Sequence, residues 1–352
     1  MALFGKPKGL IGLDIGSSSV KVVELKKAKE GYELLSVGLE PLSPDTVVDG
    51  AIMDSLSVST AIEKIFTEQK IKIKSVATSV SGHSVIVKKV TMAYMEEIEL
   101  FDHIQTEAEQ HIPFDIADVN LSFQVLETNP AANSQEVLLV AAKKDKILNH
   151  TNVLNQAGKL STVVDIDAFA LQNCYEVNYE PPPDLTAALL NIGASVMNIG
   201  IVHGTTPLFT HDVSVGGNQY TDALQKELDL SFEDAENLKK GAEVPGVSED
   251  QKVSVLKSVS EILVLEIHKT FDFFRASATA ENIQHIYVAG GSARIPGIRD
   301  LLKEEFSVPV EELNPFQRIT YSPGKFNDEY IRELSARLAV AVGLGLRSFD
   351  PV

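Results

Sequence analysis

A glycine and a run of serines follow a short apolar segment near the start of this chain, a pattern that can bind phosphate. Asp14 ends the segment Leu10–Asp14, and Gly16 and Ser17–Ser19 come next. A hairpin turn of this kind exposes backbone N–H groups, and glycine lets a phosphate group approach them closely. Asp14 stands where a carboxylate can hold a hydrated Mg²⁺ ion. The same residues are also typical of an ordinary hairpin turn, so this segment alone leaves both interpretations open.

A second segment of the same kind lies in the middle of the chain. Leu189–Ile199 contains an apolar run, then Asn191, then Gly193 and Ala194. Asn191 replaces the acidic residue of the first segment, and an amide cannot accept a proton in the relevant pH range. Two facing hairpins of this type therefore predict nucleotide binding with weak or absent hydrolysis. The alternative is that Asn191 only caps the turn.

A third segment, Ile286–Gly297, has the composition of a nucleoside-binding turn. Its apolar run is followed by Gly290, Gly291, Ser292 and Arg294. The glycines would let a purine lie on the backbone, and the next helix would point its N-terminus at phosphate groups. The Arg294 guanidinium is able to stack on a purine ring. A pair of glycines is weak evidence alone, but the three segments follow one another in a consistent order.

Four further residues are candidates with a second explanation. Asp165 and Asp167 are expected at a strand-to-helix junction, where they would cap the helix. The three segments resemble the nucleotide cleft of actin-like folds, and that resemblance implies a water-orienting role at this junction as the alternative. Glu236 and Lys239 are expected on one face of a helix, where they would form a solvated ion pair. The resemblance to Hsp70-like chains implies contact with a nucleoside as the alternative.

Composition limits the partners and the compartment. The chain has 352 residues, 44% of them hydrophobic, and a formal net charge of −18, which argues against nucleic acid and anionic lipid as direct partners. A single cysteine excludes an internal disulfide. No signal peptide and no apolar run of roughly 20 residues is found, so we expect a cytoplasmic protein that reaches a membrane only through a protein partner. The histidines, among them His103, His111 and His150, lack metal-ligand spacing and are expected at the surface.

The order of predicted strands and helices indicates two large halves, one with an insertion. A strand–helix–strand–strand–helix block after Gly82 looks like an inserted subdomain, and the spacer Pro181–Pro183 is the best candidate for a crossing between the halves. The expected first half is 1–83 with 159–184 and a C-terminal helix at 331–352, and the insertion is 84–158. The expected second half is 185–217 with 282–330, and 218–281 is a helical subdomain.

The three segments together resemble the nucleotide cleft of the actin, Hsp70 and sugar-kinase superfamily. The resemblance implies an α/β fold of the actin-like (ASKHA) class, with two RNase H-like halves around a cleft and an inserted subdomain like that of FtsA. ATP and Mg²⁺ are the implied ligands, with Asp14 holding the metal through water and Asp165 and Asn191 near the attacking water. The implied nucleotide-binding residues are Asp14, Gly16, Ser17, Ser18, Ser19, Lys21, Asn191, Gly193, Ala194, Glu236, Lys239, Gly290, Gly291, Ser292 and Arg294.

Several other stretches are similar to the PilM family: Leu3–Lys6 just before the first hairpin, Glu107–Asp115 followed by Val119–Leu126, Val215–Leu224, and Ala235–Lys239. That family is the actin-like cytoplasmic component of type IV pilus assembly, and hence of twitching motility. The resemblance implies an ATP-binding scaffold under the inner-membrane platform that captures the cytoplasmic N-terminal tail of PilN in a groove beside the insertion. Other platform proteins, assembly ATPases and a second copy of the chain are further candidate partners. Ile112–Phe114 would either line that groove or simply pack where a helix stops.

Two alternatives stay open from sequence. An FtsA-like filament former would need a C-terminal amphipathic helix, which the final residues Arg347–Val352 do not supply. A true ATPase or sugar kinase of the same superfamily would need a well-placed aspartate base, and no such residue has a distinctive sequence context.

Overall fold

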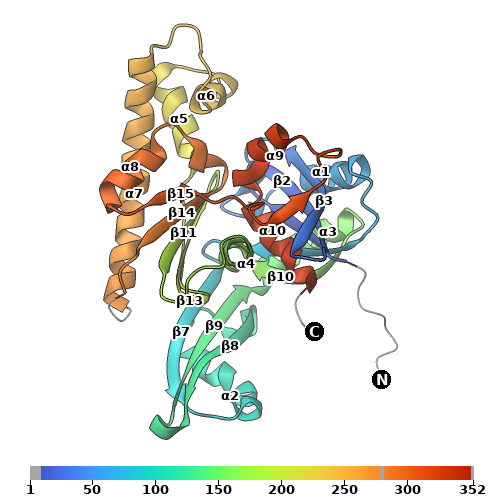
Figure 1. Cartoon of the computed structure of the whole chain (residues 1–352), viewed down its shortest axis with the longest axis vertical. Helices are drawn as coiled ribbons and strands as arrows, with labels where there is room; N and C mark the ends of the chain where they lie inside the picture. The colour runs from blue at the N-terminus through green and yellow to red at the C-terminus, as the bar shows by residue number, and fades with distance from the viewer. Residues whose placement is uncertain (1–8, 278–280, 350–352) are drawn as a thin grey trace.

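Two twisted sheets form the body of the protein, and a smaller lobe projects from it (Figure 1). The computed structural model describes residues 9–277 and 281–349, and Leu3–Lys6 lies outside these ranges. Both main sheets begin with an antiparallel three-strand meander whose first strand pairs in parallel with a later strand. Both sheets thus share the same arrangement of these strands, as expected of two homologous halves.

The first sheet has the order β10-β6-β1-β2-β3-β16. Its strands are β1 (Ile11–Ile15), β2 (Ser19–Lys27), β3 (Tyr32–Pro41), β6 (Ser75–Val80), β10 (Leu160–Ile166) and β16 (Ile319–Tyr321). The helices α1 (Ser55–Glu68) and α3 (Lys144–Gln156) cover one face. The helices α4 (Asp167–Tyr179) and α10 (Ala339–Leu346) lie on the other face, toward the second sheet. A short hairpin, β4 (Val47–Val48) with β5 (Ala51–Ile52), precedes α1.

The second sheet has the order β13-β12-β11-β14-β15. Its strands are β11 (Thr186–Ile192), β12 (Met197–His203), β13 (Thr206–Val213), β14 (His285–Ala289) and β15 (Val310–Glu312). Its outer face packs against the helical part of this half, which comprises α5 (Gly217–Leu228), α6 (Phe232–Lys239), α7 (Glu249–Ser277) and α8 (Ile298–Phe306). The 3₁₀ turn Gly291–Arg294 connects β14 to α8.

The projecting lobe is a three-stranded antiparallel sheet with one helix (Figure 1). It contains β7 (Val85–Ala93), α2 (Glu97–Glu109), β8 (Val119–Asn129) and β9 (Ser134–Lys143), with 3₁₀ turns at Ile116–Asp118 and Pro130–Ala132. Alternate residues of the strands pack under α2, as the two-residue period of a strand requires. Ile112 is buried and Phe114 half-buried in this lobe core, which favours the packing role for this stretch.

Two expected boundaries differ from the structure. Residues 144–156, expected in the insertion, form α3, which packs against α1 because its apolar side chains Val153 and Leu154 face the first core. Residues 319–321, expected in the second half, form β16 and pair in parallel with β3 of the first sheet. The C-terminal segment is not one helix either. It consists of α9 (Asp328–Leu334), a 3₁₀ turn at Ser335–Arg337, α10 and a second 3₁₀ turn at Arg347–Phe349.

Close contact of α10 with its neighbours joins the halves. A Cβ atom at Gly343 would lie 1.7 Å from the carbonyl oxygen of Ala170 in α4, and one at Gly12 of β1 would lie 2.1 Å from the carbonyl oxygen of Ala341. The apolar core around these helices includes Leu189 and Tyr287 of the second sheet. The two helices are therefore the shared wall between the halves.

We expect Gly343→Ala to lower the free energy of unfolding by at least about 2 kcal/mol, because the new methyl group overlaps backbone that has no room to move. Urea unfolding followed by circular dichroism measures the change. Gly324→Ala is the matched control, since its nearest neighbouring atom would be 3.9 Å away. Equal stability of the two variants would contradict the close packing of α4 on α10.

Candidate functional site

The first hairpin places a carboxylate and an ammonium group beside a tight turn. Asp14 and Lys21 are register partners on β1 and β2, and Lys21 Nζ lies 3.0 Å from Asp14 Oδ2. The turn closes through Gly16 N–H, which donates to Ser19 O at 3.1 Å. A Cβ atom at Gly16 would lie 2.6 Å from Lys21 Nζ, so only glycine lets the ammonium approach the turn. This turn therefore combines backbone donors, hydroxyl groups and one cation, as a phosphate site needs.

The second hairpin is joined to two other predicted segments at Gly193. The carbonyl of Gly193 accepts bonds from Gly217 N–H at 2.9 Å and from Ser292 Oγ at 2.9 Å. The Ala194 carbonyl accepts a bond from Asn218 N–H at 2.8 Å. The hairpin, the start of α5 and the turn after β14 thus form one continuous wall, although they are far apart in sequence.

Gly290 turns the chain where β14 ends. Its φ angle is +88°, a region that favours glycine, and a Cβ atom there would lie 2.3 Å from the carbonyl oxygen of Ile192. Its N–H donates to the Ala336 carbonyl at 2.7 Å, which ties this turn to the C-terminal segment of the first half. The structure therefore places Gly290 and Gly291 between the second hairpin and that segment.

Glu236 and Lys239 lie beside this wall as a buried pair. Lys239 Nζ donates to Thr221 Oγ1 at 2.7 Å, to Gly217 O at 3.2 Å and to Glu236. Burial lowers the pKa of Lys239, whereas the Lys239 ammonium holds the pKa of Glu236 below its usual value despite burial. Lys239 is 9% exposed, so the alternative of a fully solvated ion pair is wrong.

A chain of polar side chains connects the second hairpin to the first half. Asn191 Nδ2 donates to Asn198 Oδ1, and Asn198 Nδ2 donates to Asp212 Oδ1, each at 2.8 Å. Asp212 Oδ2 in turn accepts the N–H of Gly82 at 2.6 Å. Burial raises the pKa of Asp212. Sequence reasoning missed Asp212, because no motif in the sequence of β13 marks it.

The structure separates the two aspartates that the sequence left equivalent. Asp165 Oδ2 accepts a bond from Arg347 Nε at 2.6 Å, so this carboxylate is held by the C-terminal turn. Asp167 accepts a bond from Ser79 Oγ at 2.5 Å and is half-buried. Burial, with the nearby charges of Asp14 and Asp212, raises the pKa of Asp167 to about 6. Asp167 therefore faces the region between the hairpins, whereas Asp165 is engaged elsewhere.

Three carboxylates, Asp14, Asp167 and Asp212, thus lie close enough to affect one another electrostatically. In the described part of the chain, no three acidic, histidine or cysteine side chains converge closely enough to ligate a metal directly. The arrangement fits a hydrated Mg²⁺ ion, whose charge is balanced by carboxylates and phosphate while it keeps several of its waters.

Two basic side chains of α3 are buried behind this region, and sequence analysis missed both. Lys146 is 8% exposed and His150 is 3% exposed, so the expectation of a surface position was wrong for His150. His150 Nε2 lies 3.3 Å from the carbonyl of Gly50. Burial and the Lys146 charge lower the pKa of His150 to about 4. Burial also lowers the pKa of Lys146, against the opposing effect of Asp167.

Arg294 is held in place by the hydrogen-bond donors of its guanidinium. Its guanidinium pairs with Glu312 and donates to the backbone carbonyls of Arg332 and Glu333 at 2.6 and 2.7 Å. It also donates to Ser335 Oγ at 3.0 Å. These bonds fix the planar group against the C-terminal segment, so Arg294 joins the halves in this structure.

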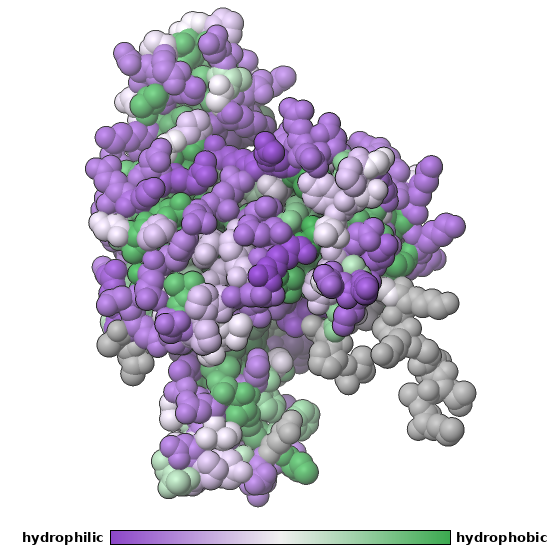
Figure 2. Space-filling view, in the orientation of Figure 1, coloured by the Kyte–Doolittle hydropathy of each residue, from purple (hydrophilic) through white to green (hydrophobic). Residues whose placement is uncertain are grey.

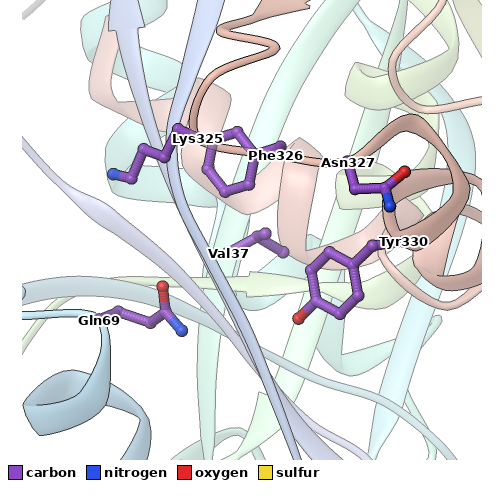
Figure 3. Close-up of a pocket in the computed structure, with 6 residues that line it drawn as sticks. All are labelled: Val37, Gln69, Lys325, Phe326, Asn327 and Tyr330. Atoms are coloured by element: carbon purple, nitrogen blue, oxygen red, sulfur yellow. The ribbon is translucent and has the colours of Figure 1, made fainter.

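A separate pocket of about 370 Å³ lies at the outer edge of the first half (Figure 3). Its walls come from β3, the end of α1 and the region before and within α9, and comprise Val37, Gln69, Lys325, Phe326, Asn327 and Tyr330. None of the predicted site residues lines this pocket. We therefore assign the candidate site to the hairpin region.

Comparison with known proteins identifies the family. The model of the type IV pilus assembly protein PilM family matches residues 12–349. This chain belongs to the PilM family. A solved PilM–PilN type IV pilus biogenesis complex has a TM-score of 0.88 and 25% identity, covering 98% of this chain and 100% of the other. The PilM resemblance expected from sequence is thereby confirmed.

More distant relatives agree with this assignment. The cell division protein FtsA of Streptococcus pneumoniae serotype 2 is 24% identical over 348 residues, covering 87% of this chain and 75% of the relative. MreB5 of Spiroplasma citri bound to ADP has a TM-score of 0.55 at 14% identity, covering 96% of this chain and 95% of that protein. That likeness concerns the fold alone. The expected actin-like α/β fold is confirmed, and the chain is an actin-like protein of pilus assembly.

Within residues 9–277 and 281–349, no helix combines the length and the apolar character needed to cross a bilayer.

Asp167→Asn should change how stability depends on pH. The pKa of Asp167 is about 6 when folded, against 3.8 as the reference value, so the folded state binds this proton more tightly. Wild-type stability relative to Asp167→Asn should therefore fall by about 1–3 kcal/mol as the pH rises from about 4 to about 6, then stay constant. Urea unfolding at several pH values measures this. Asp184 is exposed, so the stability of Asp184→Asn should depend on pH as that of the wild type does. The same pH dependence in Asp167→Asn would contradict the raised pKa of Asp167.

Proposed function

We propose that this chain is an ATP-binding scaffold of the type IV pilus inner-membrane platform that binds the cytoplasmic N-terminal tail of a PilN protein. The observation that carries the proposal is the likeness to a PilM–PilN complex over nearly the whole of both chains. In this proposal the protein lies at the cytoplasmic face of the inner membrane because PilN holds it there, and it supports pilus assembly and twitching motility.

ATP and Mg²⁺ are the proposed ligands of the region between the hairpins. The turns at Gly16 and Gly193 would bind phosphate oxygens, with Ser17, Ser18, Ser19 and Lys21 on one side and Ala194 on the other. Gly290, Gly291 and Ser292 would contact the nucleoside, and the buried pair Glu236 and Lys239 would shape the wall beside it. Support comes from the way Gly193, Gly217 and Ser292 share hydrogen bonds, because that arrangement brings phosphate and nucleoside segments together.

Hydrolysis is proposed to be weak or absent. Asn191 already donates to Asn198 and cannot accept a proton, and Asp165 is bound to Arg347. We assign any water-orienting role to Asp167 instead, because its carboxylate faces the region between the hairpins and its pKa of about 6 suits proton acceptance near neutral pH. Phosphate release would distinguish a true ATPase from a binding scaffold, and sedimentation with and without ATP would reveal an FtsA-like filament.

The proposed tail-binding surface is the junction between the lobe and the first half. Hydrophobic side chains gather on the lobe in Figure 2. At its base, the half-buried side chains Val87, Val140, Val164 and Phe169 pack around a small buried cluster. These residues come from the lobe strands β7 and β9 and from β10 and α4 of the first half. A short extended peptide with apolar residues would complete this partly covered surface.

We expect Asp14→Ala to abolish the Mg²⁺ dependence of ATP binding and to weaken binding at least tenfold, because the carboxylate that would hold the hydrated ion is gone. Titration calorimetry with and without Mg²⁺ measures the effect. Glu33→Ala removes a carboxylate from an exposed ion pair with Lys26 and should bind ATP as the wild type does. Unchanged Mg²⁺-dependent affinity in Asp14→Ala would show that the first hairpin is not the phosphate site.

We expect Val87→Lys to weaken binding of a synthetic PilN N-terminal peptide at least tenfold while ATP binding stays unchanged, because a charge would enter the apolar junction. Lys88→Ala is the control, since Lys88 is exposed and its side chain points to the opposite face of the lobe sheet. Fluorescence anisotropy measures peptide affinity. Equal affinity in the two variants would place the tail elsewhere.

Nucleotide and tail binding should be coupled if ATP favours one angle between the halves. In that case ATP changes peptide affinity and the peptide changes ATP affinity by the same factor. Calorimetric titrations in both orders measure the two factors. If both ligands bind but neither changes the affinity for the other, nucleotide does not control the scaffold.

A further inference from the structure

Arg337 lies along the glycine turn of the candidate nucleoside site. It ends the 3₁₀ turn between α9 and α10, and a Cβ atom at Gly291 would be 3.6 Å from both Cγ and Cδ of Arg337. Gly291 itself is exposed. The aliphatic part of Arg337 therefore covers a backbone surface that carries no side chain. The neighbouring hydrogen bond from Gly290 N–H to Ala336 O, at 2.7 Å, holds this segment in place.

The Arg337 guanidinium has no hydrogen-bond or ion-pair partner among the residues that the structure describes, although its side chain is half-buried. Arg294, on the 3₁₀ turn after β14, is the opposite case, because Glu312 and two backbone carbonyls use its donors. Burial lowers the pKa of Arg337, the nearby charge of Glu333 opposes this shift, and the charge of Arg294 adds to it. A partly desolvated guanidinium that no carboxylate contacts directly is costly to fold, so a ligand that contacts it would recover part of that cost.

We propose that Arg337 stacks on the purine ring of the bound nucleotide and so takes the role that the sequence suggested for Arg294. This inference rests on the proposed nucleotide function and adds a residue to it. The ligand chemistry is an aromatic base on the face of the planar guanidinium, beside the exposed backbone of Gly291. A purine fits because a guanidinium stacks well on aromatic rings.

The position of Arg337 favours contact with the base over contact with the phosphates. The aliphatic part of its side chain lies against Gly291. The phosphate turn of this half is instead at Gly193, whose carbonyl accepts hydrogen bonds from Ser292 and Gly217. The cation near the phosphates in the first half is Lys21, at the Gly16 turn. Arg337 is thus positioned beside the nucleoside end of the site.

The test is titration calorimetry with ATP, adenosine and inorganic tripolyphosphate on the full chain. Arg337→Ala should lower affinity for ATP and for adenosine by about 3- to 30-fold, the range of a guanidinium–aromatic contact, and leave tripolyphosphate binding unchanged. Arg337→Lys keeps a charge but not a planar group, and should lose most of the same affinity. Arg332→Ala is the matched control, because Arg332 is exposed on the preceding helix.

Other outcomes would overturn the inference in distinguishable ways. Wild-type affinity for ATP in Arg337→Ala would show that Arg337 does not contact the nucleotide, while the proposed ATP site itself would stand. A loss confined to tripolyphosphate and ATP, with adenosine unaffected, would make Arg337 a phosphate ligand. Failure of the wild type to bind any of the three probes would instead refute the proposed nucleotide function, and Arg337 stacking with it.

Discussion

The contact of α10 with α4 and β1 is the constraint on which the rest of the structure depends. At Gly343 and Gly12 the backbones meet so closely that no side chain fits between them. Such dense packing resists continuous deformation. Any rearrangement of this interface would therefore be a switch between discrete arrangements. The same apolar core reaches Leu189 and Tyr287 of the second sheet, so the two halves share one wall. Any change in the angle between the halves has to occur around that wall.

That shared wall explains why acidic groups from both halves meet in the candidate site. Asp14 and Asp167 come from the first half and Asp212 from the second, and burial, together with the charges of Asp14 and Asp212, raises the pKa of Asp167. Like charges held at close range favour a cation between them or a proton on one of them. Binding of a Mg²⁺–nucleotide complex would relieve this repulsion, and the effect would depend on how far apart the halves lie. Under the proposed function, electrostatics would therefore link the site to the angle between the halves.

The lobe is connected to the same region through continuous chain. β9 of the lobe runs directly into α3, and α3 carries Lys146, which is buried and senses the charge of Asp167. A partner that moves the lobe would act on β7 and β9 at their base, where Val87 and Val140 are register partners. The path from the lobe to Lys146 is covalent, along one strand and one helix, and Lys146 interacts with Asp167 through its charge. Under the proposed function, this path would let nucleotide and tail influence each other.

Local pattern was enough to predict the hairpins at Asp14 and Asn191, the glycine turn at Gly290 and the family, because strand–turn signals and glycine requirements act over a few residues. The same pattern could not choose between Asp165 and Asp167, since the choice depends on Arg347, a residue 182 positions away in the chain. It also missed Asp212, His150 and Lys146, and it assigned stacking to Arg294 where the structure leaves Arg337 beside Gly291. Burial and the competition among charged partners decide these roles, and both arise only when distant segments pack together.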